Sequence, residues 1–155
     1  MTRNLPDFRD NAIILIDQLK EIYVDGELAP IDTVSWFPTM YRKDYQIGYG
    51  FSAGVADDPD DQFYTVYSCD AQLNYTGYCN RELEKRFERQ SMEADQEKRR
   101  QLVWEIDKKL QEDGARPIVY HTRSATCMQP QLEGLTVMVN SQYNGWRMED
   151  VWLDR

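Results

Sequence analysis

The stretch from Tyr78 to Gly114, YCNRELEKRFERQSMEADQEKRRQLVWEIDKKLQEDG, decides the fold because two capped helices are predicted within it. Asn80 is a favourable N-cap, and Leu83 and Phe87 lie one turn apart on the helix that it opens. Asp95 caps the second helix. The apolar stripe of this second helix comprises Leu102, Val103, Ile106 and Leu110. The stretch therefore predicts two helices that each bury one face.

The residues before this stretch alternate between helical and strand patterns. A helix is predicted over 7–23 and a strand over 27–31, with a turn at Asp25-Gly26 between them. A second helix is predicted over 33–42, interrupted by Pro38, and a further strand over 44–51. Helices and strands that alternate with such short links predict an α/β fold, with helices packed on a mixed sheet.

The residues after the stretch continue the alternation. Gly114 ends the second helix, and strands are predicted over 118–121 and 135–139. The tail, 146–153, is apolar and aromatic, so we expect it to dock on another surface. No repeat or linker divides the 155 residues, and a chain of this length is expected to bury one sizeable core.

The charge and the hydropathy of the chain limit its partners. A formal net charge of −9, from 27 acidic and 18 basic residues, argues against nucleic acid as a partner. No apolar run approaches the length of a membrane span. Met1-Thr2-Arg3-Asn4 leads directly into structured sequence without a signal-peptide pattern, which fits a mature fragment and a cytosolic protein equally.

The sequence offers no pattern for a metal or a cofactor. His121 is the one histidine, and without a second ligand at metal spacing we expect a partly buried strand residue there. Neither a glycine-rich dinucleotide pattern nor a phosphate-binding loop is present. No nucleophile elbow supports a serine hydrolase. The prediction is therefore a protein without metal or cofactor.

The segment 52–77 is predicted to be irregular, and it carries the acidic run Asp57-Asp58-Pro59-Asp60-Asp61. Such a run is most often a solvated turn, where aspartate and proline suit the backbone. A carboxylate that faces a ligand is the second interpretation. Calcium comes third, because the alternating pattern of a calcium loop is missing, and a catalytic carboxylate pair comes last.

Two of the three cysteines, Cys69 and Cys79, lie ten residues apart around a turn-rich segment. A disulfide between them would stabilise the fold by about 2–3 kcal/mol, mainly by restricting the unfolded chain. Spacing does not fix connectivity, so two free thiols fit the sequence as well. Cys127 has no partner and is predicted to be a small buried apolar residue.

Five short segments, taken in order, resemble the bacterial extracellular solute-binding proteins of oligopeptide, dipeptide and nickel ABC importers. These segments are Asp44-Tyr45-Gln46-Ile47 with Asp58-Pro59-Asp60 and Phe63, Tyr78 to Lys85, Asp95 to Arg99 with Leu110 to Asp113, Glu133-Gly134-Leu135, and Glu149 to Leu153. Each motif alone is weak, but the series covers nearly the whole chain with natural spacings. The chain thus resembles the C-terminal part of this class.

The resemblance implies a type II periplasmic binding protein, in which two lobes close over a solute and present it to a membrane permease. Residues 1–126 would form most of the second, C-terminal lobe. Residues 127–155 would return toward the first lobe, which this chain would lack. The whole protein would be periplasmic or extracellular, where a Cys69–Cys79 disulfide is expected. Surface that the first lobe normally covers would let the fragment self-associate.

The resemblance also implies a ligand-binding loop, from which this sequence departs. Peptide-binding members carry an aspartate three residues before the Asp-Pro pair, and Val55 stands there instead. A peptide amino group buried against Val55 would lose its counter-ion, unless Asp57 or Asp58 replaces it. A sugar, opine or metal chelate therefore stays open as the solute. The ligand-contacting residues expected from the resemblance are Phe51, Ser52, Gly54, Val55, Asp57 and Asp58.

Two other function classes stay open. An acid-assisted hydrolase would use two loop aspartates, with the pKa of one of them strongly raised. A protein-interaction domain would recruit its partner through an exposed apolar face.

Overall fold

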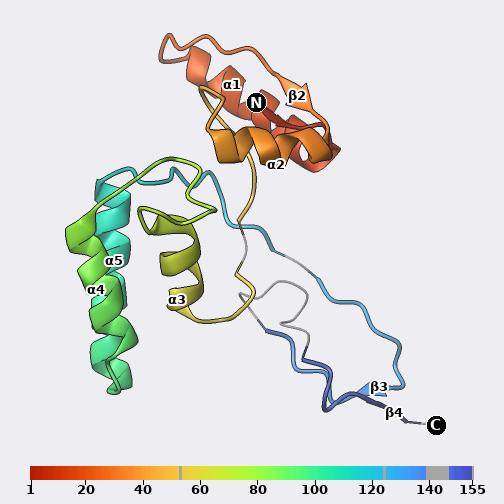
Figure 1. Ribbon diagram of the computed structural model, residues 1–155. Coiled ribbons are helices and arrows are strands. Elements are labelled where there is room, and N and C mark those ends of the chain that lie inside the picture. The colour runs from red at the N-terminus through yellow and green to blue at the C-terminus, as the bar shows by residue number, and fades with distance from the viewer. Residues whose placement is uncertain (53, 124, 139–146, 155) are drawn as a thin grey trace. The chain divides into compact units, whose positions relative to one another are not determined.

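The computed structural model describes residues 1–52, 54–123, 125–138 and 147–154 (Figure 1). The chain divides into two compact units. Unit 1 comprises Met1–Ser52 and Gln72–Gly77, and unit 2 comprises Ala53–Ala71 and Tyr78–Arg155. Each unit has its own buried cluster, so each is described by itself.

Unit 1 is a small parallel sheet with two helices. The strand β1 (Thr2–Arg3) pairs in parallel with β2 (Pro30–Ile31), and Thr2 also forms a parallel bridge with Tyr49. The helices α1 (Pro6–Lys20) and α2 (Thr33–Arg42) both contact β1 (Figure 1). Three chain segments thus run in the same direction, as the α/β prediction requires.

Local signals explain the limits of α2. The side chain of Asp32 accepts a hydrogen bond from the backbone N–H of Ser35 at 2.9 Å and so caps the helix. Lys43 ends it in the left-handed conformation, at a φ of 56°. The predicted interruption at Pro38 is wrong, because the helix continues through this residue to Arg42. Proline removes one backbone hydrogen bond, and the packing of the buried face outweighs that loss.

The core of unit 1 is aromatic. Trp36 and Met40 from α2 are buried together with Tyr75, and Tyr45 packs against them. The Tyr45 hydroxyl donates to the carbonyl of Tyr75 at 2.6 Å. Tyr75 belongs to the short segment Gln72–Gly77, which lies far from α2 in the sequence. Unit 1 is therefore completed by a distant piece of chain.

Unit 2 is mainly helical. It contains α3 (Pro59–Gln62), the π-helical turn η1 (Phe63–Tyr67), α4 (Arg81–Ser91) and α5 (Gln96–Glu112) (Figure 1). The predicted caps are confirmed, since Asn80 accepts from the N–H of Leu83 at 3.1 Å and Asp95 from that of Lys98 at 3.0 Å. The predicted irregular course of 52–77 is wrong in part, because α3 and η1 lie within it.

The core of unit 2 lies where α4, α5 and η1 meet. Its buried members are Phe63, Leu83, Phe87, Ile106, Leu110 and Ala115. The rings of Phe63 and Phe87 are stacked at 4.8 Å between centroids and 8° between planes. The predicted apolar faces of the two long helices are thus confirmed at Leu83, Phe87 and Ile106.

Several strand predictions are corrected by the structure. The predicted strand 27–31 shortens to Pro30–Ile31, and 44–51 keeps only the bridge at Tyr49. Neither 118–121 nor 135–138 forms a strand, and position 139 lies outside the described residues. An antiparallel pair forms instead between β3 (Leu132–Glu133) and β4 (Trp152–Leu153). Strand formation depends on pairing with segments that are distant in the sequence, and the hydrophobic pattern within one segment does not identify those partners.

Two single-residue predictions are also wrong. His121 lies in an exposed irregular segment rather than in a strand, and Cys127 is exposed rather than buried. Both residues follow the end of α5, where the described chain forms no regular element until β3. No packed layer covers their side chains there.

Candidate functional site

The residues expected to contact a ligand are divided between the two units. Phe51 and Ser52 end the first segment of unit 1, while Gly54, Val55, Asp57 and Asp58 begin unit 2. Phe51, Val55 and Asp57 are exposed, Asp58 is half-buried and Gly54 is buried. Each unit therefore presents its own candidate surface.

The candidate surface of unit 1 lies at the carboxyl ends of its parallel segments. β1 ends at Arg3, β2 is followed by Asp32 and Thr33, and the bridge at Tyr49 is followed closely by Phe51. Ligands of open α/β sheets bind at this edge, because the loops after parallel strands gather there. Phe51, which the family resemblance suggested, lies at this edge.

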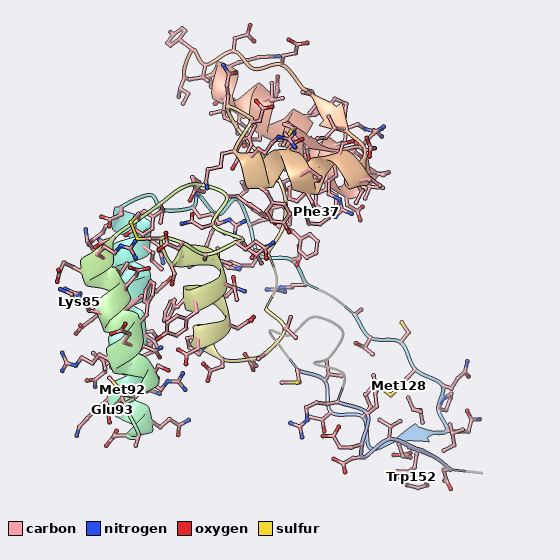
Figure 2. All side chains as sticks on the ribbon, viewed as in Figure 1. Phe37, Lys85, Met92, Glu93, Met128 and Trp152 are labelled. Atoms are coloured by element: carbon pink, nitrogen blue, oxygen red, sulfur yellow. A yellow bond between two sulfur atoms is a disulfide. The ribbon has the colours of Figure 1, made fainter. Side chains whose placement is uncertain are left out.

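Arg3 is the centre of this edge. Its guanidinium carbon lies 4.7 Å from the ring centroid of Phe8 and 5.8 Å from that of Phe37, which projects from α2 (Figure 2). Its Nε donates to the hydroxyl of Thr33 at 3.2 Å. The ring of Phe8 in turn lies 5.8 Å from that of Phe51. We call Arg3, Phe8, Thr33, Phe37 and Phe51 the Arg3 cluster.

The electrostatics of the Arg3 cluster favour an anionic group. Within the described part of the chain, no carboxylate pairs with the Arg3 guanidinium, although the protein carries a net charge of −9. The rings of Phe8 and Phe37 pack on the guanidinium, and its N–H groups point outward in the guanidinium plane. These N–H groups can donate two parallel hydrogen bonds to a carboxylate. The side chain is half-buried, which strengthens such a pair compared with one in open solvent.

Sequence reasoning did not find Arg3. The residue stands near the N-terminus in a short segment without a motif, and its neighbours Phe8, Thr33 and Phe37 are spread over 30 positions. A basic residue at the end of a short strand and just before a helix was the available signal. That signal gains meaning only once the strand is known to be parallel to its neighbours.

The acidic loop of unit 2 is occupied by contacts within the protein. Arg99 on α5 binds both carboxylate oxygens of Asp58, from Nη2 at 2.7 Å and from Nη1 at 2.9 Å. Asp60 accepts hydrogen bonds from the Gln90 amide and from the Ser91 hydroxyl, the latter at 2.6 Å. Arg99 also donates to the side-chain oxygen of Gln90 at 3.1 Å. We call these five residues the Arg99 network.

The Arg99 network fixes the start of α3. Asp58 caps this helix by accepting from the N–H of Asp60 at 2.9 Å. Asp61 accepts from the backbone N–H of Val55 at 2.8 Å and so closes the loop in front of the helix. The carboxylate of Asp58 thus accepts hydrogen bonds from Arg99 and from the first turn of α3. Its role in this structure is to hold the loop on α4 and α5.

The electrostatics of the loop differ from those that a hydrolase needs. Hydrogen bonding from Arg99 lowers the pKa of Asp58, and the cap bond from Asp60 acts in the same direction. An acid-assisted hydrolase requires a carboxyl group whose pKa is raised. Asp58 therefore lacks the electrostatic property that the hydrolase hypothesis assigned to the acidic run.

A further surface feature of unit 2 is a hollow on its two long helices. A shallow hollow of about 260 Å³ lies along α4 and α5 and is lined by Arg89, Glu93, Lys98, Gln101, Leu102 and Glu105. Its lining is mostly charged, whereas small-molecule sites are largely apolar. Within the ranges that the structure describes, no three potential metal ligands gather. No helix in these ranges is long and apolar enough to cross a membrane.

A disulfide joins Cys69 to Cys79, with their Cα atoms 4.4 Å apart. The pairing that the resemblance implied is therefore confirmed. The bond lies at the start of α4, where Glu84 accepts from the N–H of Cys69 at 2.8 Å. It closes the loop whose tip, Gln72–Gly77, belongs to unit 1.

Comparisons with known proteins agree with this arrangement. No protein family and no curated protein matches the chain. Solved structures do match, and two of them are described here. One is the ABC transporter substrate-binding protein CtaP of Listeria monocytogenes, with 28% identity over 67% of this chain and a TM-score of 0.60. The other is the oligopeptide-binding protein AppA of Bacillus subtilis in complex with a nonapeptide, with 19% identity over 99% of this chain and a TM-score of 0.75.

The chain spans only part of these solved proteins, namely 22% of the CtaP chain and 31% of the AppA chain. Both are described as binding proteins of transport systems or of oligopeptides, rather than as enzymes. Because the match to AppA extends over nearly all of this chain, it covers both units and the predicted motifs. The resemblance in those motifs is thereby confirmed, and the chain has the fold of one part of an ABC transporter substrate-binding protein of the oligopeptide-binding kind.

Proposed function

We propose that this chain is part of the substrate-binding component of an ABC importer. In this role it contributes one side of a site that captures a peptide-like or other small solute for a membrane permease. The observation that carries the proposal is the match to oligopeptide-binding AppA over 99% of the chain at a TM-score of 0.75. The protein acts by binding and release, and its partners are the solute and the permease.

The Arg3 cluster supplies the proposed anchor for the solute. A carboxylate on the solute would receive two parallel hydrogen bonds from the Arg3 guanidinium. The helix α1 begins shortly after Arg3 without a side-chain cap, so its N-terminal backbone amides add a favourable dipole. The rings of Phe37 and Phe51 offer apolar area beside the charge. A peptide with a free carboxyl terminus and an apolar last residue has this combination of groups.

The residues that the family resemblance suggested are proposed as ligand contacts, each on the surface of its own unit. Phe51, Ser52, Gly54, Val55 and Asp57 keep the role that the family resemblance suggested, while Asp58 holds the loop through Arg99. Val55 offers no charge to an amino group, so Asp57 is the proposed counter-ion when the solute carries one.

The proposed domain division follows the same architecture. Residues 1–126 form most of one lobe, and residues 127–155 form a segment that returns toward another lobe. The whole protein acts in the periplasm or outside the cell, where importers receive their solutes and the Cys69–Cys79 disulfide persists. Exposed apolar residues in the return segment, such as Trp152 and Leu153, would support self-association of the isolated chain.

A titration followed by nuclear magnetic resonance tests the proposed function. The ¹⁵N-labelled chain is mixed in turn with trialanine, D-glucose and sodium chloride at equal ionic strength. We expect trialanine to shift amide resonances of unit 1 in a saturable way and to remain intact during the experiment. Cleavage of the peptide, or no saturable shift with either solute, would contradict the proposed function.

A further inference from the structure

The loop closed by the Cys69–Cys79 disulfide links the two units. Its ends lie in unit 2, and its tip, Gln72–Gly77, belongs to unit 1. The chain therefore leaves unit 2 after Ala71, contributes to the core of unit 1, and returns at Tyr78. The disulfide joins the two chain segments at the base of this loop.

The tip of the loop is a structural part of unit 1. Tyr75 is 8% exposed and Asn74 is 3% exposed. The Tyr75 ring lies 6.0 Å from that of Trp36 and 5.6 Å from that of Tyr41. Its carbonyl accepts from the Tyr45 hydroxyl at 2.6 Å. Removal of the tip would open the core around Trp36 to water.

The tip also has a defined local shape. The side chain of Asn74 accepts a hydrogen bond from the N–H of Gly77 at 3.0 Å. Gly77 has a φ of +73°, a conformation that favours glycine. Loop ends that are held close together restrict the conformations of the tip, and so favour the position of Tyr75 in the core of unit 1.

At the base of the loop, both ends have non-covalent contacts with unit 2, since the N–H of Cys69 donates to Glu84 at 2.8 Å and Tyr78 packs against the buried core cluster. Arg81 pairs with Asp70 and with Glu84 at 3.0 Å each, and the side chains of Arg81 and Asp70 are largely exposed. Exposed ion pairs contribute little to stability. The Tyr78 hydroxyl donates to Asp113 at 2.7 Å, again near the surface. The disulfide adds a covalent constraint on the separation of the two ends.

We propose that the Cys69–Cys79 disulfide is a redox-dependent latch, which lies in unit 2 but controls the stability of unit 1. In the oxidised state it keeps Tyr75 in the core beside Trp36. On reduction by a dithiol, two electrons and two protons are transferred, the S–S bond is replaced by two thiols, and the dithiol becomes a cyclic disulfide. The loop ends then separate, and the tip leaves the core of unit 1.

Hydrogen–deuterium exchange of the 155-residue chain tests the latch. The wild type is compared before and after reduction with dithiothreitol, and with the double variant Cys69→Ser/Cys79→Ser. We expect exchange in α2 to accelerate by roughly tenfold or more in both cases, while α4 and α5 change far less. The variant Cys127→Ser serves as the control, because it removes a thiol outside the latch.

A second variant separates the latch from a general loss of stability. Tyr75→Ala in the oxidised protein should accelerate exchange in α2 to a similar extent, and adding it to the double cysteine variant should change little further. Equal acceleration in α2, α4 and α5 would overturn the proposal, as would unchanged exchange in α2. Additive effects of Tyr75→Ala and of the cysteine substitutions would also overturn it. None of these outcomes depends on a solute, so the proposed transport role is tested separately.

Discussion

At the scale of single residues, the pair formed by Asp58 and Arg99 shows how a chemically suggestive run can have a structural role. The sequence presents four aspartates in five positions, and the contacts of Asp58, Asp60 and Asp61 tie the run to the rest of the protein. Arg99 stands 41 positions away, on a helix that the acidic run does not identify. The sequence could predict the turn, but it could not predict that the side chain of Arg99 would pair with Asp58.

The substitution Asp58→Asn tests this role through its pH dependence. Because Arg99 lowers the pKa of Asp58 in the folded state, the pair stabilises the fold at pH values above the ordinary aspartate pKa. This stabilisation disappears as the pH falls through the lowered pKa. We expect Asp58→Asn to cost about 1 kcal/mol at neutral pH, since the pair is partly exposed, and almost nothing at about pH 2.

Urea unfolding of both proteins at several pH values measures this difference. Asp17→Asn is the matched control, because its ion pair with Lys20 is 3.7 Å long and its side chain is 81% exposed. A gap between wild type and Asp58→Asn that stays constant or widens in acid would show that Arg99 does not stabilise the charged form.

Gly50 provides a second test at the residue scale. A Cβ atom at this position would lie 2.7 Å from the ring of the buried Trp36, which has little room to move. We expect Gly50→Ala to destabilise the protein by about 1–3 kcal/mol through overpacking. Gly26→Ala is the control, because its Cβ would make only an ordinary contact of 3.5 Å with Ile16. Equal unfolding midpoints for the two variants in urea would contradict the packing seen around Trp36.

At the scale of elements, the long helices were predictable, whereas the strands and the short helical turns were not. α4 and α5 carry their caps and their apolar stripes within the sequence that forms them, so local patterns were sufficient. β1 and β2 are two residues long and exist through pairing with each other. The π-helical turn η1 was missed for a related reason, since its buried residue Phe63 packs on the distant Phe87.

The contact between η1 and α4 predicts a large effect of Phe87→Ala. Phe87 is 1% exposed, and its ring is stacked on that of Phe63. Truncation leaves a cavity at the centre of unit 2, so we expect a loss of about 3–5 kcal/mol in chemical unfolding. Trp104→Ala on α5 is the control, because this side chain is 61% exposed and should cost well under half as much. Comparable losses for the two variants would contradict the assigned core.

At the scale of the whole molecule, the family resemblance predicted the fold correctly, whereas its ligand-contacting residues stay a prediction. The order of the motifs indicated the binding-protein fold, which the match to AppA confirms. Phe51 was predicted as a ligand contact, whereas Arg3 was not. Arg3 acquires its position from the pairing of three parallel segments and from rings on two helices, and none of these relations is local in the sequence.

The size of the chain relative to its solved neighbours sets the expected affinity. It spans 22% and 31% of those two chains, so the proposed site is one side of a larger one. We expect the isolated chain to bind solutes weakly, with dissociation constants in the millimolar range, because much of the contact area is absent. A micromolar dissociation constant measured by isothermal calorimetry would contradict the expectation that the isolated chain provides only one side of the site.

The most direct test of the central claim, that the Arg3 cluster holds the carboxylate of a solute, compares a peptide acid with its amide. The ¹⁵N-labelled chain is titrated with Ala-Phe and with Ala-Phe amide, in the wild type, in Arg3→Gln and in Arg42→Gln as the control. The account predicts saturable shifts around Arg3 and Phe37 with Ala-Phe, and binding weaker by roughly tenfold for the amide or for Arg3→Gln. Arg42→Gln should bind as the wild type does. Equal binding of the acid and the amide, or unchanged binding by Arg3→Gln, would contradict the claim.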